Sequence, residues 1–289
     1  MRIIVTGASG LLGSHVCRHL LAEGHVVTGI DRTLVLGAPW EQLTADLTDL
    51  GVAMQLIREC DCVMHIASIP RPLGLAEVEV FRTNMALAYN VTEAACLGAV
   101  PRVVYASSVS ILGYPFGARF VPPDYLPINA DHPVAPQDSY GLSKWLGEEV
   151  LDAAVRRCGI SAVSLRMPWI QTPEEFGKSV VPRRKTAAAA HDLWAYLDAR
   201  DAATGFSLAL AWPGTGHLRV YLSAQDSFSE QPSAELIRKA FPETPLRRRF
   251  QGFESLIDTA PAVETLGFQA QHSWRDYEQE LAGQTNETI

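Results

Sequence analysis

A glycine-rich turn near the start of the chain restricts the possible fold more than any other feature of the sequence. The β-branched run Ile3–Thr6 leads directly into it, and apolar residues spaced by four continue beyond it to Glu23. The three glycines are Gly7, Gly10 and Gly13. At this spacing the first glycine permits a tight turn, the second lets a pyrophosphate approach the backbone, and the third lets a helix pack on the strand. The sequence therefore predicts a strand, turn and helix that bind a dinucleotide at the helix N-terminus.

The residue at the end of the next apolar run indicates which dinucleotide binds. Asp31 follows the run Val26–Ile30, where a carboxylate accepts hydrogen bonds from the adenosine ribose hydroxyls and repels a 2′-phosphate. This favours NAD. Arg32 comes next, and a guanidinium at that position could bind the same phosphate, so NADP stays an alternative.

Short β-branched runs alternate along the chain with helix-length amphipathic segments. The runs are Ile3–Thr6, Val26–Ile30, Val63–Ile66, Val103–Ala106 and Ala162–Leu165. Helices are expected over Leu11–Glu23 and Met85–Leu97. This alternation is typical of an α/β protein, here a Rossmann-type doubly wound parallel sheet with a smaller carboxyl-terminal substrate lobe.

A loop and a weakening of the alternation predict the domain organisation. The segment from Gly113 to Ser139 is rich in proline, which continues neither a helix nor a central strand, so a long loop is expected there. We expect residues 1–170 to form the NAD-binding Rossmann domain and residues 171–289 a substrate-binding lobe. Within that lobe, residues 191–224 are expected to pack back on the Rossmann sheet.

Composition excludes several classes of partner. The formal net charge is −8, and Arg247–Arg249 is the single tight basic cluster, better explained by a solvated turn or local ion pair than by nucleic-acid binding. No apolar run approaches the roughly 20 residues that span a membrane, and a cytoplasmic location is expected. The five scattered cysteines are expected to be reduced, buried thiols, and the Cys60–Cys62 segment lacks the second ligand pair of a zinc site, so no metal is expected.

A tyrosine and a lysine four residues apart suggest proton transfer. Tyr140 and Lys144 project from one face near the start of a predicted helix, where an ammonium stabilises the phenolate of its neighbour. Such a pair can move a proton onto or off a carbinol oxygen. Ser107 and Ser108 end a predicted strand at the carboxyl edge of the sheet, where a hydroxyl could hold the same oxygen.

Together these motifs match a known family. They occur in the order Thr6–Gly13, Asp46–Leu47, His65–Ser68, Asn84, Ala106–Ser108, Tyr140–Lys144 and Leu165–Pro168. In this order the chain resembles the extended short-chain dehydrogenases/reductases, the NAD-dependent epimerase/dehydratase group.

The resemblance assigns roles to particular residues. It implies that Tyr140 is the acid/base, that Lys144 binds the nicotinamide ribose and lowers the tyrosine pKa, and that Ser108 orients the substrate oxygen. It also implies a homodimer through the helices that contain Met85–Leu97 and residues 140–156. Besides the three glycines, Asp31, Arg32, Tyr140 and Lys144, the expected cofactor contacts are Ser9, Leu11, Leu12, Asp46, Leu47, Ala67, Ser68, Asn84, Ala106, Met167 and Trp169.

A departure from the family pattern narrows the reaction. Family dehydratases carry Asp-Glu directly after the active-site Ser or Thr, whereas Val109 and Ser110 follow Ser108 here, so dehydration lacks its acid and base. The expected function is an NAD-dependent dehydrogenase or epimerase. Its small-molecule substrate is expected to be a sugar, a sugar acid or a nucleotide sugar. The alternatives are an NADP-dependent reductase of a small non-sugar carbonyl compound and a non-catalytic dinucleotide-binding sensor.

Two further positions are interpreted as structural. His65 lies within an apolar strand and is expected to be a hydrogen-bonded core histidine. Glu148 and Glu149 follow Lys144 on an amphipathic helix and are expected on its solvated face.

Overall fold

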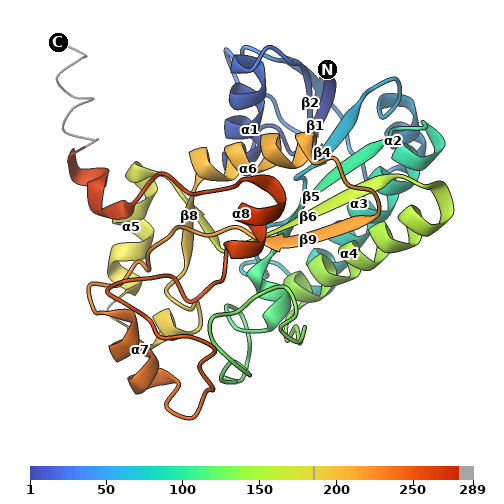
Figure 1. Ribbon diagram of the computed structural model, residues 1–289. Helices are drawn as coiled ribbons and strands as arrows, with labels where there is room; N and C mark the ends of the chain where they lie inside the picture. The colour runs from blue at the N-terminus through green and yellow to red at the C-terminus, as the bar shows by residue number, and fades with distance from the viewer. Residues whose placement is uncertain (185, 280–289) are drawn as a thin grey trace.

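The fold is built on one parallel sheet. The computed structural model describes residues 1–184 and 186–279, and within them seven strands pair in the order β3-β2-β1-β4-β5-β6-β9 (Figure 1). The strands are β1 (Arg2–Thr6), β2 (Val26–Asp31), β3 (Glu41–Thr44), β4 (Cys62–His65), β5 (Arg102–Ser108), β6 (Ser161–Met167) and β9 (His217–Tyr221). The strand order reverses between β1 and β4, where a doubly wound sheet binds ligands outside its carboxyl ends. The predicted α/β class is confirmed.

Helices cover both faces of the sheet (Figure 1). One face packs against α1 (Leu11–Ala22), α6 (Ala199–Ala211) and α8 (Ala260–Leu266) through a core that includes Val16, Phe206 and Leu266. The other face packs against α2 (Leu50–Leu56), α3 (Glu77–Leu97) and α4 (Ser139–Cys158). The apolar periodicity led us to expect this helix to begin at Met85, but α3 begins at Glu77. Its first turns are largely exposed, so the apolar pattern does not mark them. They carry Glu77 and Glu79 near the positive end of the helix dipole.

A second cluster of apolar side chains lies beside the sheet. It contains side chains of β8 (Tyr196–Asp198), α5 (Pro173–Arg183) and α7 (Ser233–Ala240), and β8 pairs with β7 (Trp169–Gln171). The proline-rich loop after η1 (Val109–Leu112) enters this core through Leu126 and Ile128, which are fully buried. Strand β9 and helix α6 belong to the main sheet and its covering layer, so the chain leaves the sheet after β6 and returns to it.

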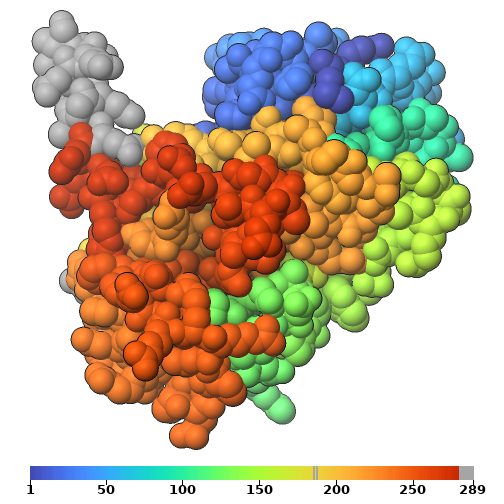
Figure 2. Space-filling view, viewed as in Figure 1, coloured from blue at the N-terminus to red at the C-terminus, as the bar shows by residue number. Residues whose placement is uncertain are grey.

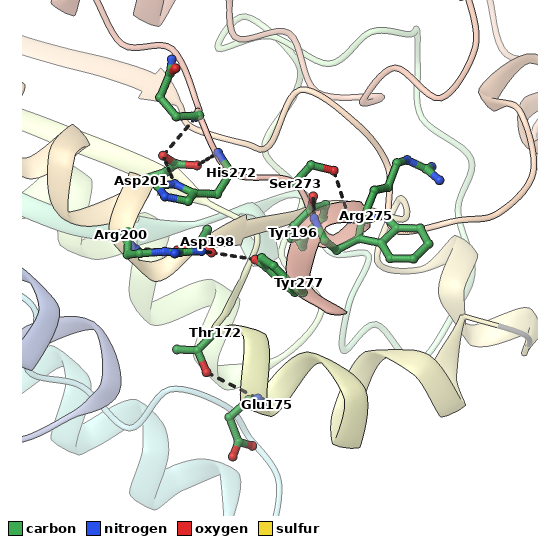
Figure 3. A network of polar contacts seen from close by, with 12 residues as sticks. Thr172, Glu175, Tyr196, Asp198, Arg200, Asp201, His272, Ser273, Arg275 and Tyr277 are labelled. Carbon is green, nitrogen blue, oxygen red and sulfur yellow. Dashed lines mark hydrogen bonds and ion pairs between the residues drawn. The ribbon is translucent and has the colours of Figure 1, made fainter. Parts of the chain in front are cut away.

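Hydrogen bonds hold the carboxyl-terminal segment against β8 and α6 (Figure 3). The Tyr277 hydroxyl donates to Asp198 Oδ2 at 2.8 Å, and His272 Nδ1 lies 2.8 Å from Asp201 Oδ1. In the space-filling view this segment, coloured red, lies against orange segments on the near face of the molecule (Figure 2). The lobe is thereby joined to the sheet by polar contacts as well as by its apolar core. No helix in the described ranges has the length and apolar character needed to span a lipid bilayer.

Candidate active site

The glycine turn has the shape that its spacing predicts. Gly7 has φ +72°, and a Cβ there would lie 2.7 Å from the backbone nitrogen of Ala67. A Cβ at Gly13 would lie 2.0 Å from the Gly7 carbonyl oxygen, so only glycine lets α1 pack this closely. Gly10 differs, because a Cβ there would meet only the Gly7 oxygen, at an ordinary 3.4 Å. The space beside Gly10 is open cavity, as a pyrophosphate would require.

One cavity of about 1030 Å³ extends from this turn to the amino-terminal end of α4. It holds most of the site residues expected from the sequence. They are Gly7, Gly10, Leu11, Leu12, Gly13, Asp31, Arg32, Asp46, Leu47, Ala67, Ser68, Ala106, Ser108, Tyr140, Lys144, Met167 and Trp169. The strand order therefore brings residues from positions 7 to 169 to one edge of the sheet.

Ser9 and Asn84 lie outside the lining of this cavity and support its wall. Ser9 donates its backbone N–H to Asp31 Oδ2 at 3.0 Å. Asn84 accepts from the Ile69 N–H at 2.7 Å and donates to Ser143 Oγ at 3.1 Å, so both ends of its amide are used. These bonds fix the segment after β4 and use both N–H groups of the Asn84 amide.

The end of the cavity beside β2 carries opposite charges. Asp31 ends β2, and its two carboxylate oxygens accept from the backbone N–H groups of Ser9 and Thr33. Arg32 lines the same cavity. Hydrogen bonds from Thr48, reinforced by the charge of Arg32, hold the pKa of Asp46 below its usual value against the opposing effect of burial. The residues present fit a dinucleotide with free ribose hydroxyls.

Ser108, Tyr140 and Lys144 come together at the other end. Ser108 is the last residue of β5, and Tyr140 is the second residue of α4, whose first turn is capped by Asp138. A Cβ at Gly141 would lie 2.4 Å from the Ser110 carbonyl oxygen, so this glycine lets α4 approach the segment after Ser108. Lys144 then follows Tyr140 by one helical turn on the same face.

Burial disfavours the charged form of both titratable groups. It raises the pKa of Tyr140 to about 12, although a hydrogen bond with Ser108 acts in the opposite direction, so the lowered tyrosine pKa that the resemblance implies is not found in this structure. Burial also lowers the pKa of Lys144 to about 7. Lys144 Nζ donates to the Ala106 carbonyl oxygen at 2.7 Å and to Ser68 Oγ at 3.2 Å, and it lies 5.6 Å from the centre of the Tyr140 ring. The arrangement places the Tyr140 hydroxyl and the Lys144 ammonium beside the same cavity.

A family model agrees with this geometry. The model of the NAD dependent epimerase/dehydratase family matches residues 3–221. The chain belongs to this family. The family model is that of NAD dependent enzymes, in agreement with the predicted class of cofactor, and the chain stands among NAD(P)-dependent dehydrogenases and epimerases of the short-chain dehydrogenase/reductase type.

Individual relatives include both kinds of enzyme. The chain is 29% identical to L-arabinose 1-dehydrogenase (NAD(P)(+)) of Haloferax volcanii, over 67% of this chain and 76% of that one. It is 30% identical to GDP-mannose 3,5-epimerase 1 of Oryza sativa subsp. indica over 65% of this chain, but spans only 51% of that epimerase. A short-chain dehydrogenase/reductase superfamily protein of Agrobacterium tumefaciens with bound NAD superposes with a TM-score of 0.75, at 23% identity over 100% of this chain and 98% of that one, and shows the shared fold.

Glu148 is wholly buried, so the expectation of a solvated position is wrong. Arg166 donates to its two oxygens at 2.8 and 3.0 Å, Ser107 donates at 2.6 Å, and Arg219 Nε donates at 3.0 Å. Burial raises the pKa of Glu148, but these hydrogen bonds and the arginine charges outweigh it and lower the pKa below its usual value. The spacing from Lys144 explains why Glu148 is buried, because a residue four positions later lies on the same face of α4, the face that points into the protein. Glu149 is half exposed, as expected.

The cavity also contains side chains that sequence reasoning missed. Arg183 and Asp192, from α5 and the segment after η2 (Ala187–Ala190), line it, as does Phe116 from the proline-rich loop. The Phe116 ring meets the Tyr140 ring edge-on, with centroids 6.0 Å apart. No local motif marks these residues, because only the return of the chain to the sheet brings them to the cavity.

The remaining structural expectations have mixed outcomes. His65 is buried 2.8 Å from Thr6 Oγ1, and burial lowers its pKa to about 3, so the prediction of a core histidine is confirmed. Arg248 pairs locally with Glu254, as expected. The five cysteines are free, but the expectation that all are buried is wrong: Cys17 and Cys62 are buried, Cys60 and Cys96 are half-buried, and Cys158, the last residue of α4, is exposed. No group of three or more His, Cys, Asp or Glu side chains in the described residues could hold a metal.

Proposed function

We propose that this chain transfers hydride between NAD and a carbinol carbon of a sugar-like substrate, with Tyr140 as the acid/base. The observation that supports this most strongly is that Ser108, Tyr140 and Lys144 line the same cavity as the glycine turn. When bound, NAD supplies the hydride acceptor or donor. The protein supplies position and proton transfer.

Each of the three residues has a separate task. Ser108 orients the substrate oxygen by a hydrogen bond. Tyr140 removes the hydroxyl proton during oxidation and returns it during reduction. Lys144 binds the nicotinamide ribose, and its ammonium form favours the Tyr140 phenolate. Because burial keeps Tyr140 protonated at neutral pH, the group is ready to act as an acid and needs a higher pH to act as a base.

The cofactor is held along the rest of the cavity. Gly10 and the amino-terminal end of α1 receive the pyrophosphate, and Asp31 receives the adenosine ribose hydroxyls. The remaining expected contacts that line the cavity, from Leu11 to Trp169, enclose the rings and sugars. Ser9 and Asn84 contribute by fixing Asp31 and the segment after β4.

The same residues serve a dehydrogenase and an epimerase. Release of the ketone makes the reaction a dehydrogenation, whereas hydride return to the other face makes it an epimerisation. Product analysis separates the two, because a dehydrogenase accumulates NADH with its product and an epimerase does not.

Replacement of the acid/base tests the proposal. Tyr140→Phe should lower kcat/KM by about 10²- to 10⁴-fold while NAD still binds, since only the proton-transfer group is lost. Tyr125→Phe, at a half-buried tyrosine of the proline-rich loop that does not line the cavity, is the matched control and should leave the rate unchanged. A Tyr140→Phe protein that works at the wild-type rate would refute the mechanism, and absence of turnover in the wild-type protein would favour the sensor.

We also propose a homodimer through α3 and α4. Helix α3 exposes Val78, Tyr89 and Leu97, which are apolar or aromatic side chains suited to an interface. Static light scattering should give twice the mass of one chain at micromolar concentration. A monomer would contradict the proposed dimer. The cytoplasmic location stays a prediction.

A further inference from the structure

The carboxyl-terminal half of the chain reaches the active-site cavity through a charged pair. From residue 171 onward, the described side chains that line the cavity are those of Arg183, Asp192 and Ala195. Arg183 is the last residue of α5, and Asp192 follows η2. Arg183 and Asp192 are therefore the charged side chains that this half of the chain contributes to the cavity, which Tyr140 also lines.

The two side chains neutralise each other. Arg183 Nε donates to Asp192 Oδ2, and Arg183 Nη2 donates to Asp192 Oδ1 at 3.2 Å, so the carboxylate occupies one edge of the guanidinium fork. Nη2 also donates to the Ala188 carbonyl oxygen. Arg183 Nη1 has no acceptor among residues 1–184 and 186–279. One donor group of Arg183 and the unused lone pairs of Asp192 are thus available to a ligand.

The pair is also difficult to separate. The Asp192 side chain is only 11% exposed and the Arg183 side chain 33% exposed. Burial raises the pKa of Asp192, and the hydrogen bond and charge of Arg183 act against this rise. An anion that took Arg183 from Asp192 would leave that carboxylate buried without its partner, which is strongly unfavourable.

The cavity as a whole offers no excess positive charge for an anionic substrate. Its charged lining consists of Arg32, Arg71, Lys144 and Arg183 against Asp31, Asp46, Glu77, Asp138 and Asp192. Arg32 lies at the adenosine end, and the exposed Arg71 shares the segment after β4 with Glu77. The start of α1 offers N–H donors to the pyrophosphate of NAD, but a second diphosphate or a carboxylate at the wall formed by Arg183 and Asp192 would need cations or N–H donors there, and this pair provides no net charge.

We propose that the Arg183–Asp192 pair binds neighbouring hydroxyl groups of an uncharged monosaccharide and selects against sugar acids and nucleotide sugars. This inference rests on the proposed function and names its substrate class. Each sugar hydroxyl can both donate and accept a hydrogen bond, so one hydroxyl donates to Asp192 while the next accepts from Arg183 Nη1. A carboxylate in the same place would face the like charge of Asp192.

A substrate panel tests the inference. Initial rates of NAD reduction and product analysis for epimers are measured with aldopentoses and aldohexoses, the matching hexuronic acids, and UDP-glucose. For a sugar and its own uronic acid, which differ only at the terminal carbon, kcat/KM should be at least about a hundredfold higher for the neutral sugar. A preference for the uronic acid or for UDP-glucose would overturn the inference.

Charge-removing variants identify the residue responsible. Asp192→Asn keeps the shape of the side chain and removes its charge, so the ratio of uronic acid to sugar kcat/KM should rise about tenfold or more. Glu175→Gln removes a similar charge from the exposed face of α5, outside the cavity, and should leave this ratio unchanged. The ratio does not respond to a general loss of folded protein. An unchanged ratio in Asp192→Asn would contradict the role assigned to the pair.

The outcomes also separate this inference from the proposed function. Turnover of UDP-glucose alone, abolished by Tyr140→Phe, would keep the function and refute the substrate class. If no compound is turned over, ligand-observed NMR with the NAD-loaded protein still tests the inference separately from the proposed function. Binding of the neutral sugar in preference to its uronic acid would then support the Arg183–Asp192 site, while the missing turnover counts against the function.

Discussion

Glu148 and Arg166 form a doubly hydrogen-bonded ion pair inside the protein, beneath the edge of the sheet that carries Ser107. Both side chains are almost completely removed from water. Because the same carboxylate accepts from Arg219, it joins α4 to β6 and β9 directly beside the proposed active site.

Loss of this carboxylate should destabilise the fold. In Glu148→Gln the buried arginine keeps its charge without a counter-charge, and removal of one partner from such a pair costs about 3–5 kcal/mol. Urea unfolding at neutral pH measures the loss. Glu149→Gln, one residue on and half exposed, should change the free energy of unfolding by less than about 0.5 kcal/mol. Equal stability of the two variants would contradict the assignment.

The same pair should make the free energy of unfolding depend on pH in the acidic range. The folded pKa of Glu148 lies below its ordinary value of 4.5, so its contribution is complete above that pH and is lost as the pH falls through the folded pKa. The difference in unfolding free energy between wild type and Glu148→Gln should therefore narrow below about pH 4. A difference that stays constant down to pH 3 would show that another group is responsible.

The rate of oxidation should rise with pH. Oxidation needs the Tyr140 phenolate, and burial raises the pKa of this group to about 12, so the fraction of phenolate grows as the pH increases from neutral. We expect kcat/KM for oxidation to increase by less than about tenfold per pH unit above neutral pH, because Lys144, whose pKa is lowered to about 7, loses over the same range the charge that favours the phenolate. Steady-state NADH absorbance in both directions measures this. The residual rate of Tyr140→Phe should lack the rise, and a similar rise in that variant would assign the titration elsewhere.

Two glycines of the turn should respond differently to the same substitution. A Cβ at Gly13 would lie 2.0 Å from the Gly7 carbonyl oxygen, so Gly13→Ala should cost about 1–3 kcal/mol of stability. At Gly10 the nearest atom lies at 3.4 Å, so Gly10→Ala should fold normally but weaken NAD binding about tenfold or more, because its methyl group occupies space meant for the pyrophosphate. Thermal unfolding and calorimetric titration with NAD separate the two effects. Unchanged NAD affinity in Gly10→Ala would contradict the position of the pyrophosphate.

The cofactor preference should depend on Asp31. Asp31→Asn removes the charge that repels a 2′-phosphate while Arg32 remains, so the ratio of kcat/KM with NADP to that with NAD should rise about tenfold or more. Arg32→Gln is the companion variant and should lower kcat/KM with NADP while kcat/KM with NAD stays unchanged. If Asp31→Asn leaves the ratio unchanged, the adenosine ribose lies elsewhere.

Local patterns predicted most of the residues that we propose to hold the cofactor. The glycine spacing, Asp31 at the end of a β-branched run, and Tyr140 with Lys144 one helical turn apart are short-range features, because a turn, a strand end and a helix face are each set by a few neighbouring residues. The strand order then brings them to one edge of the sheet, as expected for a doubly wound fold.

Asn84 and Glu148 show where local patterns were insufficient. Each is a polar residue on a helix, and its neighbours in the sequence do not reveal its partners. Asn84 bonds with Ile69 and Ser143, and Glu148 pairs with Arg166. The four-residue spacing from Lys144 placed Glu148 on the inward face, but the need for a buried cation far along the chain was not visible.

The sequence by itself determined the fold class, the cofactor turn and the Tyr140–Lys144 pair, because each depends on contacts within one or two elements. Only the tertiary structure brought Arg183 and Asp192 to the cavity and buried Glu148 between two arginines. These contacts join residues from separate elements, and their energies depend on desolvation, which exists only once the chain has packed.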